Sequence, residues 1–213
     1  MDSRVNHEAW LEPLGSRLVA RWGHYPRIDG RLDPHVVTNI MVVGEEGVRY
    51  TPVVLVHMED GLRLEWRGGR ASYAMIAYRR GPFSKTASGE WVYGDRVAVE
   101  SVLGSVEKSM IIEGYAVYTR DPRSLEHLPT PLRLKLSIDT SPLCVRIEGV
   151  RAPDEQPDSH TTLSMWCRGE KTEDRECREA PIFILVKHDS KLGTGRVDTL
   201  RTILTVYIDA PPA

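Results

Sequence analysis

The chain has 213 residues, of which 41% are apolar and 27% are charged, and its formal net charge is −2. This apolar fraction and ordinary charge density exclude an intrinsically disordered chain. The length predicts one substantial core, because single β-rich domains reach about 250 residues. The near-neutral total charge gives no general indication of nucleic-acid or membrane binding.

The basic residues are unevenly divided, with 22 arginines and six lysines. Arginine suits bidentate and stacked contacts, but it is also frequent in GC-rich genomes and in some thermophile families. We therefore interpret the arginine excess mainly as a property of the source, with a thermophilic protein as one reading.

The first 24 residues are predicted as a helical lead. Four apolar residues recur at every fourth position, which places them on one helix face: Trp10, Leu14, Leu18 and Trp22. Pro13 suits a first helical turn and Gly23 a C-terminal cap. The apolar alternation from Leu18 to Trp22 also fits a strand, but the fourfold spacing favours a helix over about residues 6–22.

From residue 35 onward the apolar period changes to two, as expected for β-strands. Strands are predicted over residues 36–43, 48–59, 62–66, 72–80, 91–102, 110–119, 132–138, 143–150, 161–166, 181–188 and 200–209. The polar stretch 81–90 is predicted as a loop, and residues 124–128 as one short helical turn.

About ten strands without regularly alternating helices predict a mainly β protein. We expect an antiparallel β-sandwich or flattened barrel with a short N-terminal helix. The proline-containing stretch 151–160 is the best internal boundary, yet the 53 residues after it are few for an independent core. Residues 1–213 are therefore interpreted as a single β-rich domain, with a helical lead over 1–24 and a sub-boundary at 151–160.

The N-terminus lacks the basic and apolar regions of a secretory signal. No apolar run approaches the ~18 residues that a membrane-spanning helix needs. We therefore expect a cytoplasmic protein that does not contact a membrane.

The chain has three cysteines, Cys144, Cys167 and Cys177. Cys167 and Cys177 flank a charged tip between two apolar runs, so they could form a disulfide across the base of a hairpin; two unlinked cysteines are the alternative. Closing a loop of about ten residues would stabilise the fold by about 2–3 kcal/mol in the chain-entropy model.

Metal and catalytic signatures are weak. His160, Cys167, Cys177 and His188 are suitable residue types for zinc, but they lack the closely spaced ligand pair that structural zinc sites usually contain. No nucleophile elbow, phosphate-binding loop or dinucleotide fingerprint is present. We therefore assign no catalytic residue, no metal and no cofactor, and favour a protein that is not an enzyme.

Charge is distributed unevenly along the chain. Residues 61–85 contain six basic residues and one acidic residue, a net charge of +5, whereas residues 151–180 have a net charge of −3. Aromatic residues are interleaved with the basic ones, as in proteins that bind single-stranded nucleic acids. The predicted binding surface comprises Arg63, Trp66, Arg67, Arg70, Tyr78, Arg79, Arg80 and Lys85. Solvated outer faces of strands are the simpler interpretation of these arginines.

Three hypotheses of function follow. The first is a non-enzymatic binding or assembly module that contacts a protein partner or forms a homo-oligomer. The second is a protein that binds RNA or single-stranded nucleic acid through residues 61–85. The third is an enzyme of a family that carries no motif discussed above, such as a carbohydrate-active one.

Overall fold

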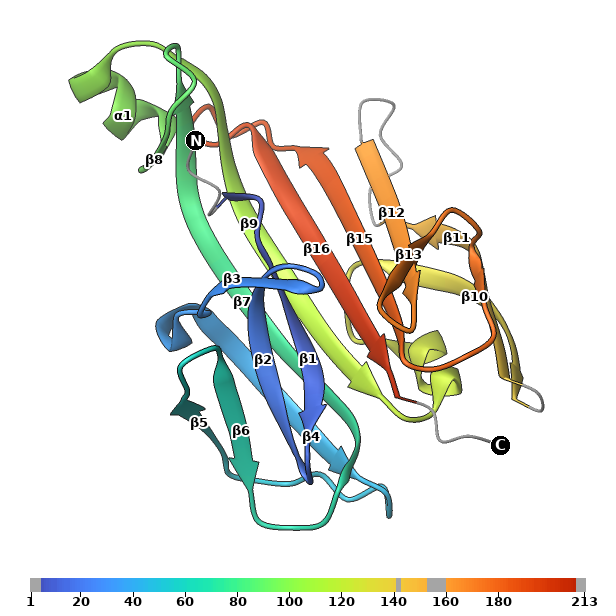
Figure 1. Cartoon of the computed structure of the whole chain (residues 1–213). Helices are drawn as coiled ribbons and strands as arrows, with labels where there is room; N and C mark the ends of the chain where they lie inside the picture. Colours follow the sequence, from blue (N-terminus) through green and yellow to red (C-terminus); the bar gives the residue numbers. More distant parts are fainter. Residues whose placement is uncertain (1–4, 141–142, 153–159, 210–213) are drawn as a thin grey trace.

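The computed structural model describes residues 5–140, 143–152 and 160–209 (Figure 1). Within these residues the chain forms sixteen strands and few helical turns, which confirms the mainly β class. The strands make three sheets, and none of them closes into a barrel in the part of the chain that is described. The arrangement is therefore that of stacked sheets, as in a β-sandwich.

The central sheet has eight strands. In spatial order they are β13 (Glu170–Thr172), β12 (His160–Cys167), β15 (Ile182–Lys191), β16 (Thr199–Ile208), β9 (Val106–Thr119), β7 (Ala71–Thr86) and β4 (Val37–Gly44), with β8 (Trp91–Tyr93) paired to β7. Strands β16 and β9 run parallel, and the other neighbours run antiparallel. The sheet thus joins the middle of the chain to its C-terminal strand.

Two smaller sheets flank the central one. The N-terminal sheet has the order β1 (Glu8–Leu14), β2 (Arg17–His24), β6 (Leu62–Trp66) and β5 (Val53–His57), with β3 (Arg27–Gly30) paired to β2. The small sheet has the order β10 (Arg133–Thr140), β11 (Leu143–Arg151) and β14 (Glu176–Cys177). Figure 1 shows these two sheets beside different parts of the central sheet.

The two flanking sheets cover opposite faces of the central sheet, because successive residues of a strand point to opposite sides. In β9, Ala116 and Tyr118 pack with Leu64 and Trp66 of the N-terminal sheet. Val117, which lies between them, packs instead with residues of the small sheet and of the 3₁₀ turn η3 (Pro122–His127). Among the described residues, the central sheet therefore has a core on each of its faces, and a third apolar cluster includes Trp10 and Phe183.

The predicted N-terminal helix is wrong, and residues 8–24 form a hairpin in which β1 pairs with β2 along seven positions. Gly15 adopts a φ of +62° in the connecting turn, a conformation that glycine tolerates well. Leu14, which completed the fourfold apolar pattern, is 39% exposed. Burial of the hairpin against the central sheet outweighs the helical spacing, a case of tertiary packing overriding local pattern.

Other segments also differ from the prediction, two of them clearly. Strand β7 continues through the expected loop 81–90 as far as Thr86, with an irregular register between Arg80 and Phe83. Residues 96–102, expected in the strand 91–102, lie in the helix α1 (Arg96–Leu103), whose N-terminus is capped by the Asp95 side chain accepting from the Ala98 N–H at 2.8 Å. No described helix is long and apolar enough to cross a membrane.

Candidate metal site

Two histidines from the N-terminal sheet lie side by side because of strand register. Glu8 pairs with Gly23 in the antiparallel β1–β2 ladder, so the preceding residue, His7, lies opposite His24. Their ring centroids are 4.6 Å apart in an edge-to-face arrangement. His7 is 4% exposed, and its ring also meets the edge of Trp22. The backbone pairing alone therefore brings together two imidazoles that are 17 residues apart.

A β-bulge adds a carboxylate to this pair. In the β2–β3 ladder Trp22 pairs with Gly30 and Gly23 pairs with Ile28, which leaves Asp29 as the extra residue. Such bulges re-aim a side chain, and here Asp29 is directed toward the histidines. Gly23 permits the close approach, because a Cβ at this position would lie 2.7 Å from the Asp29 amide nitrogen.

The three side chains converge on one point. Asp29 Oδ2 lies 2.9 Å from His24 Nδ1 and 3.7 Å from His7 Nε2, and one ligand atom from each residue falls within 4.8 Å of the others. The hydrogen bond from His24, followed by that from Arg27 at 2.5 Å, lowers the pKa of the Asp29 carboxyl. Asp29 is therefore in its carboxylate form at neutral pH, as a metal ligand must be.

The segment that carries His7 is held by a buried ion pair. Glu8 is 2% exposed, and its Oε2 accepts from Lys187 Nζ of β15 at 2.9 Å. The other carboxylate oxygen accepts from the Tyr25 N–H at 3.3 Å, and Lys187 also donates to the Asn6 carbonyl at 3.1 Å. These bonds fix the start of β1 to the central sheet and so fix the position of His7.

A cavity of about 620 Å³ opens beside these residues, which we call the histidine pocket. His7 and Asp29 line it, whereas His24, with a side chain 47% exposed, contacts Asp29 from outside the lining. The rest of the wall is formed mainly by aromatic and arginine side chains, among them Trp22, Arg79, Arg80, Phe83, Trp91 and Tyr93. A bound ion would thus be reached from a wide, partly aromatic cavity.

Two members of the predicted basic surface belong to this pocket. The Arg80 guanidinium lies 4.7 Å from the ring centroid of Trp22 and 5.2 Å from that of Phe83. Arg79 lies 3.6 Å from the carboxylate of Glu113 and its side chain is 57% exposed. The register of β7 is irregular between Arg80 and Phe83, and both residues line the cavity.

The other six members of that predicted surface are dispersed. Trp66 and Tyr78 are buried, so their rings are unavailable for stacking on a ligand, contrary to the prediction. Arg63 and Lys85 pair with Glu65 and Glu107, each at 2.6 Å. Arg67 and Arg70 are exposed near the start of β7. The structure therefore does not gather the eight residues into one surface.

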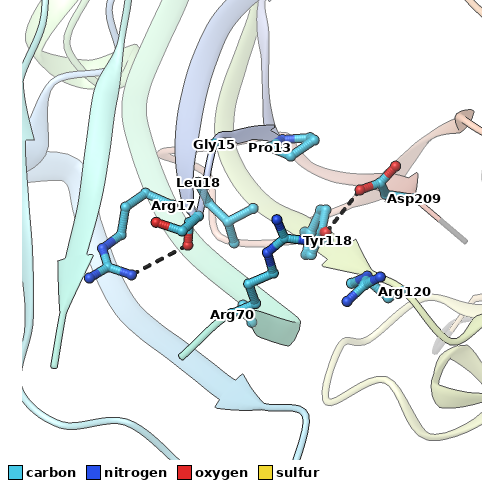
Figure 2. A pocket seen from close by; sticks show the side chains of 10 residues that line it. Pro13, Gly15, Arg17, Leu18, Arg70, Tyr118, Arg120 and Asp209 are labelled. Carbon is cyan, nitrogen blue, oxygen red and sulfur yellow. Dashed lines mark hydrogen bonds between the residues drawn. The ribbon is translucent and has the colours of Figure 1, made fainter. Parts of the chain in front are cut away.

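Arg70 lines a second, smaller pocket of about 60 Å³ (Figure 2). Two other arginines line it, but each already has a carboxylate partner: Arg17 lies 3.2 Å from Glu65, and Arg120 pairs with Glu45. The Tyr118 hydroxyl at its far side donates to Asp209 at 3.2 Å. Because of its size and this charge neutralisation, the pocket is a poorer candidate than the histidine pocket.

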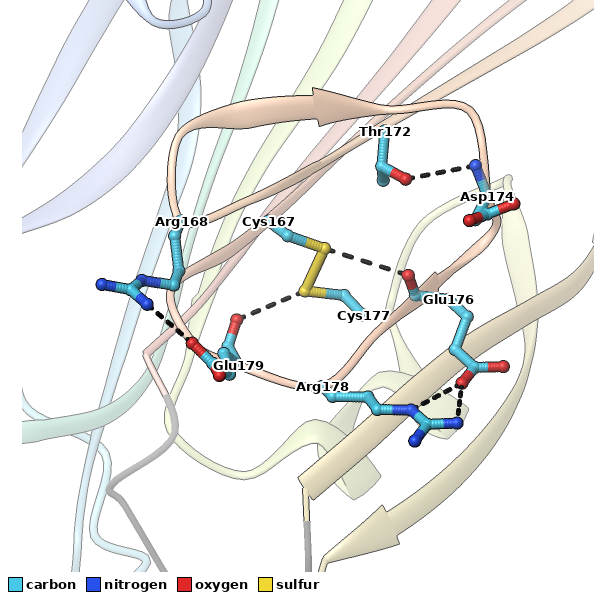
Figure 3. Close-up of a disulfide and its surroundings, with 8 residues drawn as sticks. All are labelled: Cys167, Arg168, Thr172, Asp174, Glu176, Cys177, Arg178 and Glu179. Carbon is cyan, nitrogen blue, oxygen red and sulfur yellow. Dashed lines mark hydrogen bonds and ion pairs between the residues drawn. A yellow bond between two sulfur atoms is a disulfide. The ribbon is translucent and has the colours of Figure 1, made fainter.

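Cys167 and Cys177 are joined in a disulfide with a Cα–Cα distance of 5.8 Å (Figure 3). The bond does not close the base of a hairpin as expected. Cys167 ends β12 of the central sheet, whereas Cys177 belongs to β14 of the small sheet, so the disulfide links two sheets.

Glu176, which precedes Cys177, accepts hydrogen bonds from Arg146 and Arg178, and these bonds lower the pKa of its carboxyl to about 2.

The four weak zinc candidates are not brought together. Disulfide-bonded cysteines lack the thiolates that zinc requires. His160 starts β12 and Cys167 ends it, so their Cα atoms are roughly 23 Å apart along a strand with a rise of ~3.3 Å per residue. His188 is buried, and its Nδ1 lies 2.8 Å from the Thr161 hydroxyl, at the end of β12 far from Cys167.

The predicted sub-boundary at 151–160 falls mostly on residues 153–159, which lie outside the described residues.

No protein-family model, curated protein or solved structure matches this chain. The interpretation of the site therefore depends on its own geometry. Sequence reasoning missed His7, His24 and Asp29, because the spacing of 17 and five residues resembles no local ligand motif. A hairpin interpretation of residues 8–24 would have placed His7 opposite His24, but the bulge at Asp29 carries no distinctive signal.

Proposed function

We propose that this protein is a non-enzymatic binding module whose ligand is a divalent transition-metal ion, held by His7, His24 and Asp29. The observation that supports this proposal most directly is the convergence of two imidazoles and one carboxylate within 4.8 Å. Imidazole and carboxylate ligands bind zinc and other first-row ions at about 2.0–2.2 Å, so ligand atoms of one ion lie roughly 3–4 Å apart. The separations of 2.9 and 3.7 Å between Asp29 Oδ2 and the nitrogens of His24 and His7 fit that spacing.

The donor set also indicates which ions are favoured. Nitrogen donors suit Zn²⁺, Co²⁺, Ni²⁺ and Cu²⁺, whereas Mg²⁺ and Ca²⁺ prefer sites made only of oxygen donors. Arg27, which donates to the second oxygen of Asp29, would orient the carboxylate as outer partners of metal ligands commonly do. A bound ion would offer open coordination positions to further ligands that enter the histidine pocket.

The proposal is tested with untagged protein freed of metal by a chelator. Zn²⁺, Co²⁺ and Ni²⁺ are titrated calorimetrically, and bound metal is counted by mass spectrometry after gel filtration. We expect one ion per chain for the native protein. His24→Ala and Asp29→Asn should weaken binding by about 100-fold or more, since each removes one of only three protein ligands.

His57→Ala is the matched control, because His57 is exposed on β5 of the same sheet and lies outside the cluster. It should bind metal as the native protein does. Failure of the native chain to retain any of these ions would overturn the proposal, as would equal losses in His57→Ala and His24→Ala.

One observation favours a second candidate, an enzyme. Two histidines and one carboxylate with open positions are also the ligand set of non-haem Fe(II) oxygenases. Retention of Fe²⁺ in preference to Zn²⁺ under anaerobic titration, followed by oxygen uptake on exposure to air, would support that candidate.

Self-association and nucleic-acid binding through residues 61–85 stay predictions.

A further inference from the structure

We propose that the open edge of β5 is a dimerisation surface, on which the β5 strand of a second copy of this chain pairs antiparallel about Leu55. This inference goes beyond the proposed metal site and does not depend on it. Three features of the edge support it: backbone groups that point outward, a strand without charged residues, and an adjoining core that is only half covered.

The backbone of β5 presents hydrogen-bonding groups on its outer side. β5 ends the strand order of the N-terminal sheet, and no described strand pairs with its outer side (Figure 1). The Met58 N–H donates to the Gly61 carbonyl at 2.9 Å at the end of the β5–β6 hairpin. Because bonded and non-bonded pairs alternate along an antiparallel ladder, every second residue back from Met58 bonds to β6. The residues between them direct their N–H and C=O groups outward: Val53, Leu55 and His57.

β5 lacks the features that protect the other ends of the three sheets. Exposed edges of natural sheets usually carry charges or bulges, are very short, or are covered by another segment, which prevents pairing with a further chain. β13 and β10 contain charged residues, β14 has two residues, and β4 has two register irregularities. β1 is covered, since the Thr205 hydroxyl donates to the Ala9 carbonyl at 2.7 Å. β5, with the sequence VVLVH, has no acidic residue, lysine or arginine, and its register with β6 is regular.

The core beside β5 is incompletely covered. Val53 and Leu55 of β5 are half-buried, as are Val37 and Ile40 of β4, and all four pack against the apolar cluster between the N-terminal and central sheets. Since β4 also ends its sheet, both layers of the sandwich are open on the side where these residues lie. A second copy placed there would remove their aliphatic groups from water, which favours association.

The strand is self-complementary, which identifies its partner as a second copy. An uncharged edge requires an unpaired, uncharged strand opposite it, and every further copy of this chain presents one. A two-fold axis at Leu55 places Val53 opposite His57 and Val54 opposite Val56, so that no like charges face each other at neutral pH. The outward groups of the two strands would then form about six backbone hydrogen bonds. Such a contact is isologous, as in most homodimers.

The experiment measures the mass of the metal-free native chain by sedimentation velocity over micromolar concentrations. We expect a reversible equilibrium between a monomer and a species of twice its mass. His57→Pro removes one outward N–H but no bond to β6 and no buried side chain, and an edge strand tolerates proline at such a position. It should weaken dimerisation about tenfold, because two hydrogen bonds of the ladder are lost. His57→Ala keeps the N–H and is the matched control, which should dimerise as the native chain does.

A second pair of variants tests the centre of the contact. Leu55→Lys places two like charges on the two-fold axis and should abolish the dimer. Val102→Lys makes a comparable change at a residue that is 79% exposed on α1, far from β5 (Figure 1), and should leave the dimer intact. Urea denaturation shows whether each variant is folded. If Leu55→Lys is not, the comparison of His57→Pro with His57→Ala decides.

The outcomes separate the possible partners. A native chain that stays monomeric throughout this range would overturn the inference and leave the edge to a strand of another protein. A dimer of equal strength in the native chain, His57→Pro and Leu55→Lys would also overturn it. A dimer lost only in Val102→Lys would assign the contact to α1 instead. Metal binding is measured separately by calorimetry, so failure of the metal site and failure of the dimer are distinguishable.

Discussion

The two faces of the central sheet are covered in different ways. The N-terminal sheet packs through large rings such as Trp22 and Trp66 and is tied to the central sheet by buried hydrogen bonds. The small sheet packs through aliphatic side chains, and a disulfide joins it to the central sheet. The Arg146–Glu176–Arg178 ion cluster lies within the small sheet, where it ties β14 to β11. The histidine pocket lies on the face that the N-terminal sheet covers. We therefore expect a ligand to bind on this face, and not on the face where the disulfide joins the small sheet to the central sheet.

The largest expected effect compares matched truncations of the two cores. Leu11→Ala in β1 and Leu134→Ala in β10 remove buried leucines from opposite faces, and each should lower the free energy of unfolding by about 2–5 kcal/mol. Leu11→Ala should also weaken metal binding, because β1 continues from His7. Urea denaturation and Zn²⁺ titration measure both; a loss of metal affinity in Leu134→Ala alone would contradict the assignment of the site to the first face.

Removal of the disulfide tests the second face. The Cys167→Ser, Cys177→Ser double variant should be less stable by about 2–3 kcal/mol, because the bond closes a loop with a sequence separation of 10. Metal affinity should not change, since neither cysteine lines the histidine pocket. Native protein treated with a reductant provides the control, and it should show the same loss in thermal unfolding.

Loss of one buried hydrogen bond tests the docking of β1. The Ala9 N–H donates to the Tyr78 hydroxyl at 3.2 Å, and both residues are buried. Tyr78→Phe leaves that donor without an acceptor and should cost about 1–3 kcal/mol in unfolding free energy. Tyr93→Phe, which removes a hydroxyl from an exposed ring, is the matched control and should change stability little.

The smallest expected effect is a pH dependence on the second face. The pKa of Glu176, about 2, lies below the usual value of a glutamate because Arg146 and Arg178 donate to its carboxylate. A lowered pKa contributes stability that is present above about pH 4.5 and is lost as the pH falls toward 2. Glu176→Gln should therefore lose less stability between pH 5 and pH 3 than native protein in urea denaturation; equal losses would contradict this role.

Sequence pattern predicted the β class and most strands, because alternation with period two directly reports a half-buried sheet. The stretch Leu62–Trp66 matches β6 residue for residue. The pattern failed where both faces of a segment are covered or where local capping competes with alternation. In β1 four consecutive residues are buried, so no strand period was visible there. In α1 the Asp95 cap stabilised a helix across alternating valines.

The sequence by itself determined the fold class, the position of most strands and the pair of cysteines able to form a bridge. The tertiary structure decided which sheets the disulfide connects, which arginines line a common pocket and where a set of metal ligands forms. Local pattern reports only whether a side chain is buried. The assembly of His7, His24 and Asp29 depends on the register of two ladders and on one bulged residue, which only the paired backbone specifies.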